Sequence, residues 1–263
     1  MSRVLLSQTA ISLQQRLLHR EYWIGIILDR GLPILVPLLA WMSIFNYAKL
    51  NVLEGWTASE MGGYYVLAIF IATLSNTEFH RDISDMVHRG TLDQWLVRPL
   101  TFFQLSAGVI LSRFLILLIP SSIILLISYF VAPTLPIFTL HAFLTGLVVL
   151  PLAILIFALL TTVVGLVSFW TVQIHATFAL IMVILDFLGG LMLPLSLLPT
   201  FLQSLSAYLP LRFAISDPIS AMLSSGTNLL PIVCGQLLWC TLLFLLASLL
   251  WTRGVRLYEA AGG

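Results

Sequence analysis

EFHRDISDMVHRGTLDQWLVR, residues 78–98, is the stretch around which the rest of this chain is organised. The whole chain has only 12 Lys and Arg and 11 Asp and Glu residues among 263, yet this stretch holds the charged residues Glu78, Arg81, Asp82, Asp85, Arg89, Asp93 and Arg98. Long apolar runs flank it on both sides. We therefore predict that water reaches residues 78–98 although the neighbouring runs lie in lipid. An ordinary solvated loop is the alternative interpretation.

The composition indicates an integral membrane protein. Hydrophobic residues make up 60% of the chain, charged residues 9%, and the mean hydropathy is +1.06. Globular proteins carry about 25% charged residues, so a chain this apolar could not cover its surface with polar groups in water. The net charge of +1 and the lack of a basic cluster in the sequence argue against a nucleic-acid partner.

Apolar runs of suitable length predict the fold class. A helix needs about 20 apolar residues to cross a bilayer core. The runs that meet this length are 24–47, 61–77, 103–131, 137–170, 174–195 and 228–252. We expect an all-α integral membrane protein, a single transmembrane domain over residues 1–263 with six transmembrane helices. Thr57-Ala58-Ser59-Glu60 is a capping-box pattern that opens the second helix.

The sequence also predicts a helix at the membrane surface and bends in two of the spanning helices. Residues 1–21 carry an apolar stripe opposite a basic, polar side, which is typical of a helix lying in the membrane interface; a packed soluble helix would look similar. Pro120 and Pro151 interrupt the third and fourth runs. A kink is tolerated there if neighbouring helices or hydroxyl groups satisfy the freed carbonyls.

The distribution of cationic residues predicts the orientation. If six helices alternate, one side receives Arg3, Arg16, Arg20, Arg81, Arg89, Arg98, Arg113, Arg253 and Arg256. The other side receives Lys49 and Arg212. Because positive residues favour the cytoplasmic side, we expect both termini and residues 78–98 in the cytoplasm.

Residues 194–227 are too apolar for a free external loop. Pro194, Pro199, Pro210 and Pro218 also forbid one continuous span through this segment. Short helices that dip back into the outer leaflet explain both facts, provided that protein covers their irregular backbone. An outer loop lying on the membrane is the alternative.

The chain offers little for catalysis. The phosphate-binding pattern G-x-x-x-x-G-K-[ST] needs a lysine after glycine, and the single lysine, Lys49, follows Ala48. The chain therefore cannot be a P-loop ATPase by itself. The histidines show no metal-ligand spacing, so we expect no metal site and no cofactor on this chain. Cys234 and Cys240, six positions apart, fall on different helix faces, which indicates packing rather than a disulfide.

Asp186 is the one acid deep within a predicted span. An ionisable group there costs a few kcal/mol on insertion scales, so it must gain something in return. It could line a substrate path, or it could hydrogen-bond a neighbouring helix. Gly189 and Gly190 follow it and allow a bend or a close helix approach.

Within residues 78–98, the pattern predicts two short helices. Gly90 can end the first, and Thr91-Leu92-Asp93-Gln94 is a capping-box start for the second. The apolar side would consist of Ile83, Met86, Val87, Leu92, Trp95 and Leu96. An amphipathic pair held beneath the bilayer can dock into a groove on a soluble partner.

A family resemblance rests on several of these residues. They are Trp41–Phe45, Gly55-Trp56-Thr57, Glu60-Met61 with Tyr64, Arg89-Gly90-Thr91-Leu92 and Leu96-Val97-Arg98-Pro99-Leu100. Together they resemble the permeases of ABC-2 type exporters, and most closely the bacterial subgroup that includes a viologen exporter. The likeness covers nearly the whole chain, and the R-G-T-L…L-x-R-P-L element is its most specific part.

The resemblance implies a function and a set of partners. Two ATP-binding subunits, which hold ATP and Mg, would drive this permease together with a second permease, the same or a related one, in the bacterial inner membrane. The coupling helix would lie within the residues Glu78, Arg81, Asp82, Asp85, Arg89, Gly90, Leu92, Asp93, Trp95 and Arg98. The outer gate would involve Pro194, Leu195, Pro199 and Phe201. The chain itself would not be an enzyme.

Two other classes of membrane protein are the alternatives. An ion-coupled secondary transporter often carries embedded charges and broken helices in both halves of an inverted repeat, whereas Asp186 has no clear counterpart in the first half apart from Asp29 and Arg30 near a span end. A lipid-modifying enzyme would need a cluster of polar residues at one membrane face, and only residues 78–98 supply one.

Overall fold

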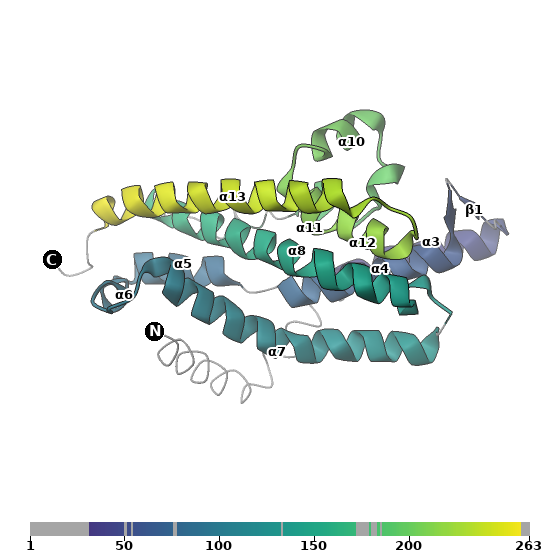
Figure 1. The fold of residues 1–263 in the computed structure, drawn as a ribbon, viewed down its shortest axis with the longest axis horizontal. Helices are drawn as coiled ribbons and strands as arrows, with labels where there is room; N and C mark the ends of the chain where they lie inside the picture. Colours follow the sequence, from purple (N-terminus) through teal and green to yellow (C-terminus); the bar gives the residue numbers. More distant parts are fainter. Residues whose placement is uncertain are drawn as a thin grey trace.

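In the part of the chain that the structure describes, five long helices lie roughly along one axis and form an elongated bundle (Figure 1). The computed structural model describes residues 32–49, 52–53, 55–75, 78–132, 134–171, 179, 183–184 and 186–258. The long helices are α3 (Leu32–Ala48), α4 (Ala58–Ser75), α7 (Phe102–Val131), α8 (Leu140–Leu166) and α13 (Leu229–Gly254). The shorter ones are α5 (Phe79–His88), α6 (Asp93–Leu96), α10 (Thr200–Ser206), α11 (Pro210–Ala214) and α12 (Ser216–Leu223).

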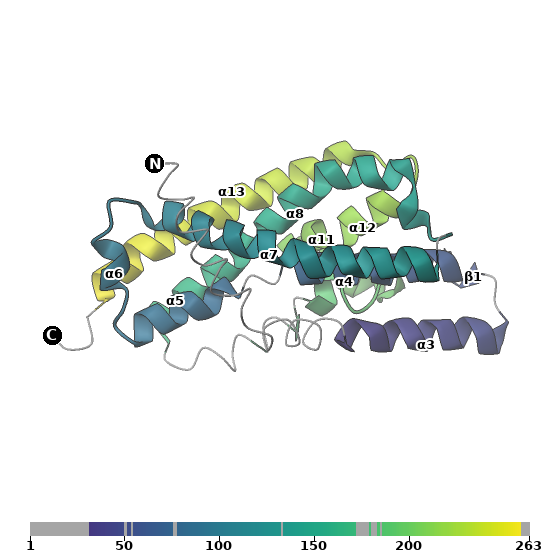
Figure 2. The same ribbon diagram turned by 90° about the horizontal axis from the view of Figure 1, so that it is seen from below.

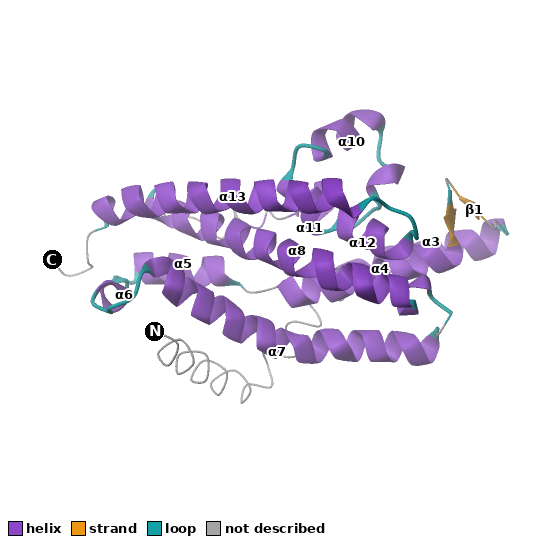
Figure 3. Ribbon diagram, in the orientation of Figure 1, coloured by secondary structure: helices purple, strands orange, loops and turns teal. Residues whose placement is uncertain are grey.

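Short 3₁₀ turns and one small hairpin complete the described elements. The turns are η2 (Pro136–Phe138), η3 (Val167–Phe169), η4 (Leu195–Leu197) and η5 (Val255–Leu257). Strands β1 (Val52–Leu53) and β2 (Trp56–Thr57) pair antiparallel, with Val52 opposite Thr57 (Figure 3). Gly55 in the turn between them has a φ of 84°, which glycine adopts without steric cost.

In the described part of the chain, four helical stretches are long and apolar enough to cross a membrane. They are Ala58–His88, which combines α4 and α5, then Phe102–Val131, Leu140–Phe169 and Leu229–Leu257. They correspond to the predicted spans 61–77, 103–131, 137–170 and 228–252. The prediction of an all-α, multi-pass membrane protein is therefore confirmed.

The count of six spans stays a prediction. Helix α3 covers the later part of the predicted span 24–47. The earlier part of that span, the predicted interfacial helix at 1–21, and residues 174–178, 180–182 and 185 of the predicted span 174–195 lie outside the described residues.

Local sequence explains where the helices begin. The capping box predicted at Thr57 forms: its backbone N–H donates to Glu60 Oε2 at 2.9 Å, and the Glu60 N–H donates to Thr57 Oγ1 at 3.2 Å. A second capping box, which the sequence analysis missed, joins Thr101 and Gln104 at the start of α7. Pro120 lies inside α7, and the adjacent Ser121 hydroxyl donates to the Leu117 carbonyl at 2.7 Å, the bond to the i−4 carbonyl that a serine makes inside a helix.

The core is built around α4 and α8. Helix α4 is buried along most of its length and packs against α3, α7 and α8, while α8 also packs against α5, α11, α12 and α13. Figure 2 shows α3 and α7 on different sides of this core. The outward faces of α7, α8 and α13 are apolar and exposed, including Leu111, Leu115, Ile119, Leu147, Leu155, Leu238 and Leu245. Such faces suit contact with lipid tails rather than with water.

Residues 194–227 form short helices, as predicted, and the prolines mark their starts. Pro194 and Pro199 are the N-caps of η4 and α10, and Pro210 is the first residue of α11. Helices α11 and α12 are buried against α8, whereas α10 projects from the side of the bundle (Figure 1). The packing of α11 and α12 on α8 covers this segment with protein, while its re-entry into the outer leaflet stays a prediction.

Candidate functional site

Helices α5 and α6 form an elbow at one end of the bundle, beside the C-terminal end of α13 (Figures 1 and 2). Helix α5 is amphipathic. Its buried side chains are Phe79, His80, Ile83 and Ser84, and its exposed ones are Arg81, Asp85 and His88, followed by the exposed C-cap residue Arg89. We call residues 78–98 the elbow. The apolar side of the elbow therefore packs against the long helices of this chain, and its charged side faces outward.

A glycine lets α5 approach α8 closely. A Cβ added to Gly165 of α8 would lie 2.8 Å from Ile83 Cδ1 and 2.9 Å from His80 Cα. Real Cβ atoms do not tolerate such distances, and one of the atoms is backbone. The lack of a side chain at position 165 therefore allows α5 to pack closely against α8.

The turn between α5 and α6 confirms one prediction and corrects another. Gly90 has a φ of 68° and follows the end of α5, and the Thr91 N–H donates to the Met86 carbonyl at 3.0 Å. This is the bond of a Schellman ending, so Gly90 ends the first helix as predicted. The predicted capping box at Thr91-Leu92-Asp93-Gln94 is wrong, because Leu92 is the N-cap of α6 and makes no side-chain cap bond.

Aromatic rings fix α6 to the long helices. Trp95 lies 6.4 Å from Phe79 and 6.1 Å from Phe102, measured between ring centroids. Phe102 of α7 in turn stacks on Trp251 of α13 at 3.9 Å. Aromatic pairs contribute roughly 0.5–1.5 kcal/mol each beyond their buried area. The elbow is therefore held by three transmembrane helices, α7, α8 and α13.

The outward surface of the elbow mixes charge with exposed apolar groups. Asp85 and Arg89 form an ion pair at 3.5 Å, yet their side chains are 52% and 74% exposed. Glu78 and Arg81 pair at 3.1 Å in the same way. Exposed pairs of this kind contribute little to stability, so these charges remain accessible to a partner. Val97 is 82% exposed beside them.

The other predicted elbow residues lie in distinct places. Leu92 is fully buried, Trp95 and Arg98 are half-buried, and Asp93 is exposed at the start of α6. Tyr258, which follows α13, lies near Asp93. Desolvation, together with the Asp93 carboxylate, raises the pKa of the Tyr258 phenol. The elbow thus contains both residues that hold it in place and residues that face outward.

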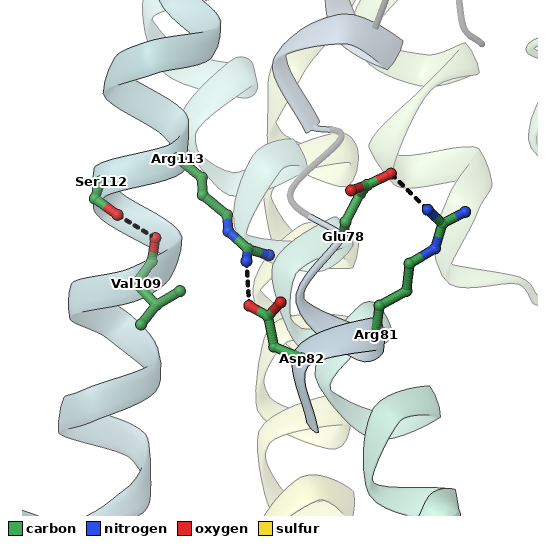
Figure 4. A network of polar contacts seen from close by, with 6 residues as sticks. All are labelled: Glu78, Arg81, Asp82, Val109, Ser112 and Arg113. Carbon is green, nitrogen blue, oxygen red and sulfur yellow. Dashed lines mark hydrogen bonds and ion pairs between the residues drawn. The ribbon is translucent and has the colours of Figure 1, made fainter. Parts of the chain in front are cut away.

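One ion pair reaches from the elbow into the membrane-spanning part of the chain. Arg113 of α7 has a side chain that is 2% exposed, and its guanidinium pairs with the Asp82 carboxylate of α5 (Figure 4). The sequence analysis assigned Arg113 to the cytoplasmic side as one of the orienting cations. The structure adds that Arg113 lies 12 positions after the N-cap Thr101, inside α7, with a carboxylate as its partner.

At the other end of α4, two hydroxyls hold the segment that precedes η4. Tyr64 donates to the Gly190 carbonyl at 2.6 Å, and Tyr65 donates to the Met192 carbonyl at 2.9 Å. Gly190 has a φ of 93°, and a Cβ there would lie 2.9 Å from the Tyr64 hydroxyl. The prediction that Gly190 allows a bend and a close approach is confirmed. Asp186, four residues earlier, is buried.

The predicted gate residues do not share one environment. Pro194 and Leu195 are buried at the start of η4, whereas Pro199 is exposed and Phe201 is 68% exposed on α10. Ser196, between them, accepts a hydrogen bond from Trp56 Nε1 at 3.0 Å. Of the four predicted gate residues, only Pro194 and Leu195 therefore share an environment.

An apolar groove of about 1240 Å³ lies between α7 and α8, with α4 behind it. Among its lining residues are Phe70, Ile110, Phe114, Ile154, Leu155 and Ala158. The sequence analysis did not predict this groove, since most of its lining residues are ordinary apolar residues of spanning helices. In the described ranges, no three His, Cys, Asp or Glu side chains gather as metal ligands. His141 instead lies 3.1 Å from the carbonyl oxygens of Ala221 and Ser224, near the end of α12.

Comparison with known proteins adds the family. A family model described as an ABC-2 family transporter protein matches residues 32–262. The chain belongs to this family. A search of the curated proteins finds no match. The chain is therefore a multi-pass membrane component of an ABC-2 transporter, and its role in such a transporter is transport rather than catalysis.

Proposed function

We propose that this ABC-2 protein is the permease subunit of an exporter and that separate ATP-binding subunits drive it by docking at the elbow. The observation that carries the proposal is the two-sided elbow. Its apolar side is fixed to α7, α8 and α13, while Arg81, Asp85 and Arg89 face outward. An element held this way can receive force from a soluble partner and pass it to spanning helices.

The proposed assembly has two ATP-binding subunits and a second permease, the same or a related one. ATP and Mg belong to the ATP-binding subunits. The Arg89–Leu92 and Leu96–Leu100 sequences support a place in the subgroup that includes the viologen exporter. The six-span topology, with the N-terminal helix at 1–21 in the interface, is part of this proposal.

The proposed location is the bacterial inner membrane, with both termini cytoplasmic. Arg81 and Arg89 lie in the elbow, Arg253 in the last turn of α13 and Arg256 in η5. The elbow and the end of α13 lie at the same end of the bundle (Figure 1). Clustering of arginines at one end supports a cytoplasmic position for that end.

The substrate path is proposed to run between the two permeases, with residues 194–227 near its outer end. Asp186 is the candidate polar residue of that path. We expect Asp186→Asn to alter transport while the assembly stays intact. Loss of assembly would instead assign Asp186 to the contacts that hold the helices together.

The first experiment is affinity purification of the tagged protein in mild detergent, followed by mass spectrometry of the proteins that accompany it. We expect a P-loop ATPase and, in a hetero-assembly, a second ABC-2 permease. Recovery of the protein alone, together with ion-dependent transport, would overturn the proposal in favour of a secondary transporter.

Two elbow variants then locate the docking surface. Arg89→Glu reverses an exposed charge, and Gly90→Leu places a side chain at a φ of 68°, which costs roughly 1–2 kcal/mol. We expect each to reduce the retained ATPase by about tenfold or more, because tenfold weaker binding corresponds to a loss of about 1.4 kcal/mol, which a reversed charge or an altered interface shape can exceed.

Arg256→Glu is the matched control. Arg256 is exposed at the same end of the bundle but lies in η5, outside the elbow. It should retain the ATPase at the level of the unmodified protein. Equal retention in Arg89→Glu and Arg256→Glu would contradict docking at the elbow.

A further inference from the structure

The ion pair between Arg113 and Asp82 joins the spanning helix α7 to the short helix α5 of the elbow. A guanidinium stays charged at any physiological pH, and Arg113 is buried inside a spanning helix. Such a charge needs a partner, and the structure supplies the Asp82 carboxylate from the elbow (Figure 4). Asp82 is 35% exposed, so the pair lies where the elbow meets the spanning part of the bundle.

Helix α5 is thereby attached to two helices at once. Its Ile83 and His80 sit against Gly165 of α8, and Asp82 holds α7 through Arg113. Helices α7 and α8 are the two sides of the apolar groove. A displacement of α5 relative to α7 or α8 must therefore change the distance between α7 and α8, or break one of the two attachments.

Helix α7 is built to bend at a position close to Arg113. Pro120, seven residues later, has no N–H and removes one bond from the helix ladder. Residues 102–119, which we call the inner part of α7, can therefore tilt about Pro120. Ile110 and Phe114 of the inner part line the groove, opposite Ile154 and Leu155 of α8.

We infer that Arg113 is a positioning residue that transmits movement of the elbow to the inner part of α7, and so sets the width of the groove during the ATP cycle. This inference rests on the proposed function, since it requires an ATPase docked at the elbow. It separates two roles within the elbow: Arg89 contacts the ATPase, whereas Asp82 passes the motion inward.

The test measures the width of the groove directly. Spin labels are placed on cysteines at Leu111 of α7 and Leu155 of α8, both exposed residues that line the groove, in a background with Cys234→Ser and Cys240→Ala. The full complex in lipid nanodiscs is compared without nucleotide and after trapping with ATP and vanadate. We expect trapping to shift the distance between the labels in the otherwise unmodified protein.

The variants address the ion pair. Asp82→Asn should lose most of the shift while retaining the ATPase, and the exchange Asp82→Arg with Arg113→Asp should restore it. Ser112→Ala is the matched control. Ser112 is a buried neighbour on α7 whose hydroxyl donates to the Val109 carbonyl at 2.7 Å (Figure 4). It should show the full shift.

The outcomes separate this inference from the proposed function. A full shift in Asp82→Asn overturns the inference and leaves the proposed function standing. Loss of the ATPase from Asp82→Asn also overturns it, because Asp82 would then belong to the docking surface. Failure of the Asp82 and Arg113 variants to assemble would make the pair purely structural. If no ATPase binds the unmodified protein, the proposed function fails and the inference fails with it.

Discussion

At the scale of single residues, Gly165 and Gly146 of α8 make a matched pair. A Cβ at Gly165 would meet backbone of α5 at 2.9 Å, whereas at Gly146 it would meet the flexible end of Met222 at 3.1 Å. We expect Gly165→Ala to destabilise the protein by about 1–3 kcal/mol through overpacking, and Gly146→Ala to cost less.

Thermal unfolding in detergent would measure both glycine variants, and proteolysis within the elbow would show whether α5 has moved. If Gly146→Ala lowered the unfolding temperature as much as Gly165→Ala, the close packing of α5 against α8 would not be the cause of the destabilisation.

Gln236 supports a second residue-scale prediction. Its side chain is fully buried in α13 and donates to the carbonyl oxygens of Val149 at 3.0 Å and Phe213 at 2.9 Å. Since net hydrogen bonds contribute about 0.5–1.5 kcal/mol each, Gln236→Leu should lower the stability by about 1–3 kcal/mol. Thr241→Ala, on the exposed face of α13, is the control and should unfold at the unmodified temperature.

The residue scale also shows what sequence patterns do not contain. Arg113 is counted from the sequence as one more orienting cation, because its partner Asp82 lies 31 positions away. Only packing of α5 against α7 brings the two together. Gln236 is likewise an isolated amide in an apolar run until α8 and α11 surround it.

At the scale of elements, the tyrosines of α4 hold the start of the outer segment. Removing both hydroxyls, in Tyr64→Phe with Tyr65→Phe, should speed hydrogen exchange at residues 190–198, since two tertiary bonds to the backbone are lost. Tyr129→Phe, on the exposed side of α7, should leave exchange there unchanged. Unaltered exchange in the double variant would show that packing alone fixes the segment.

Helix starts and ends were predictable where the signal is local. The capping box at Thr57 and the glycine ending at Gly90 each depend on residues within a few positions. The capping box expected at Thr91 fails because the Thr91 N–H belongs to the ending of α5, and α6 begins two residues later, at Asp93. Two adjacent local signals compete there, and the sequence does not rank them.

At the scale of the whole molecule, the orientation can be tested with single cysteines in a background lacking Cys234 and Cys240. An impermeant maleimide should label Ser225→Cys in intact cells, because Ser225 is exposed between α12 and α13. Asp85→Cys should react only after permeabilisation. The reverse pattern would place the elbow outside the cell and contradict the docking proposal.

The overall architecture was largely predictable, because long apolar runs leave few options but spanning helices. The family resemblance rested on short motifs, and the matching family model covers most of the chain. The groove and the double attachment of α5 were not predictable, since both depend on how α4, α7 and α8 lie relative to one another.

The lengths of the spanning helices have a consequence for the surrounding lipid. Helix α7 has 30 residues, which is about 45 Å at 1.5 Å per residue, whereas the hydrocarbon core is about 30 Å thick. Helix α13, with 26 residues, also exceeds it. Such helices must tilt or extend past the core. The angle of the bundle should therefore follow bilayer thickness, and reconstitution in lipids of increasing acyl-chain length should produce an optimum of nucleotide-driven activity.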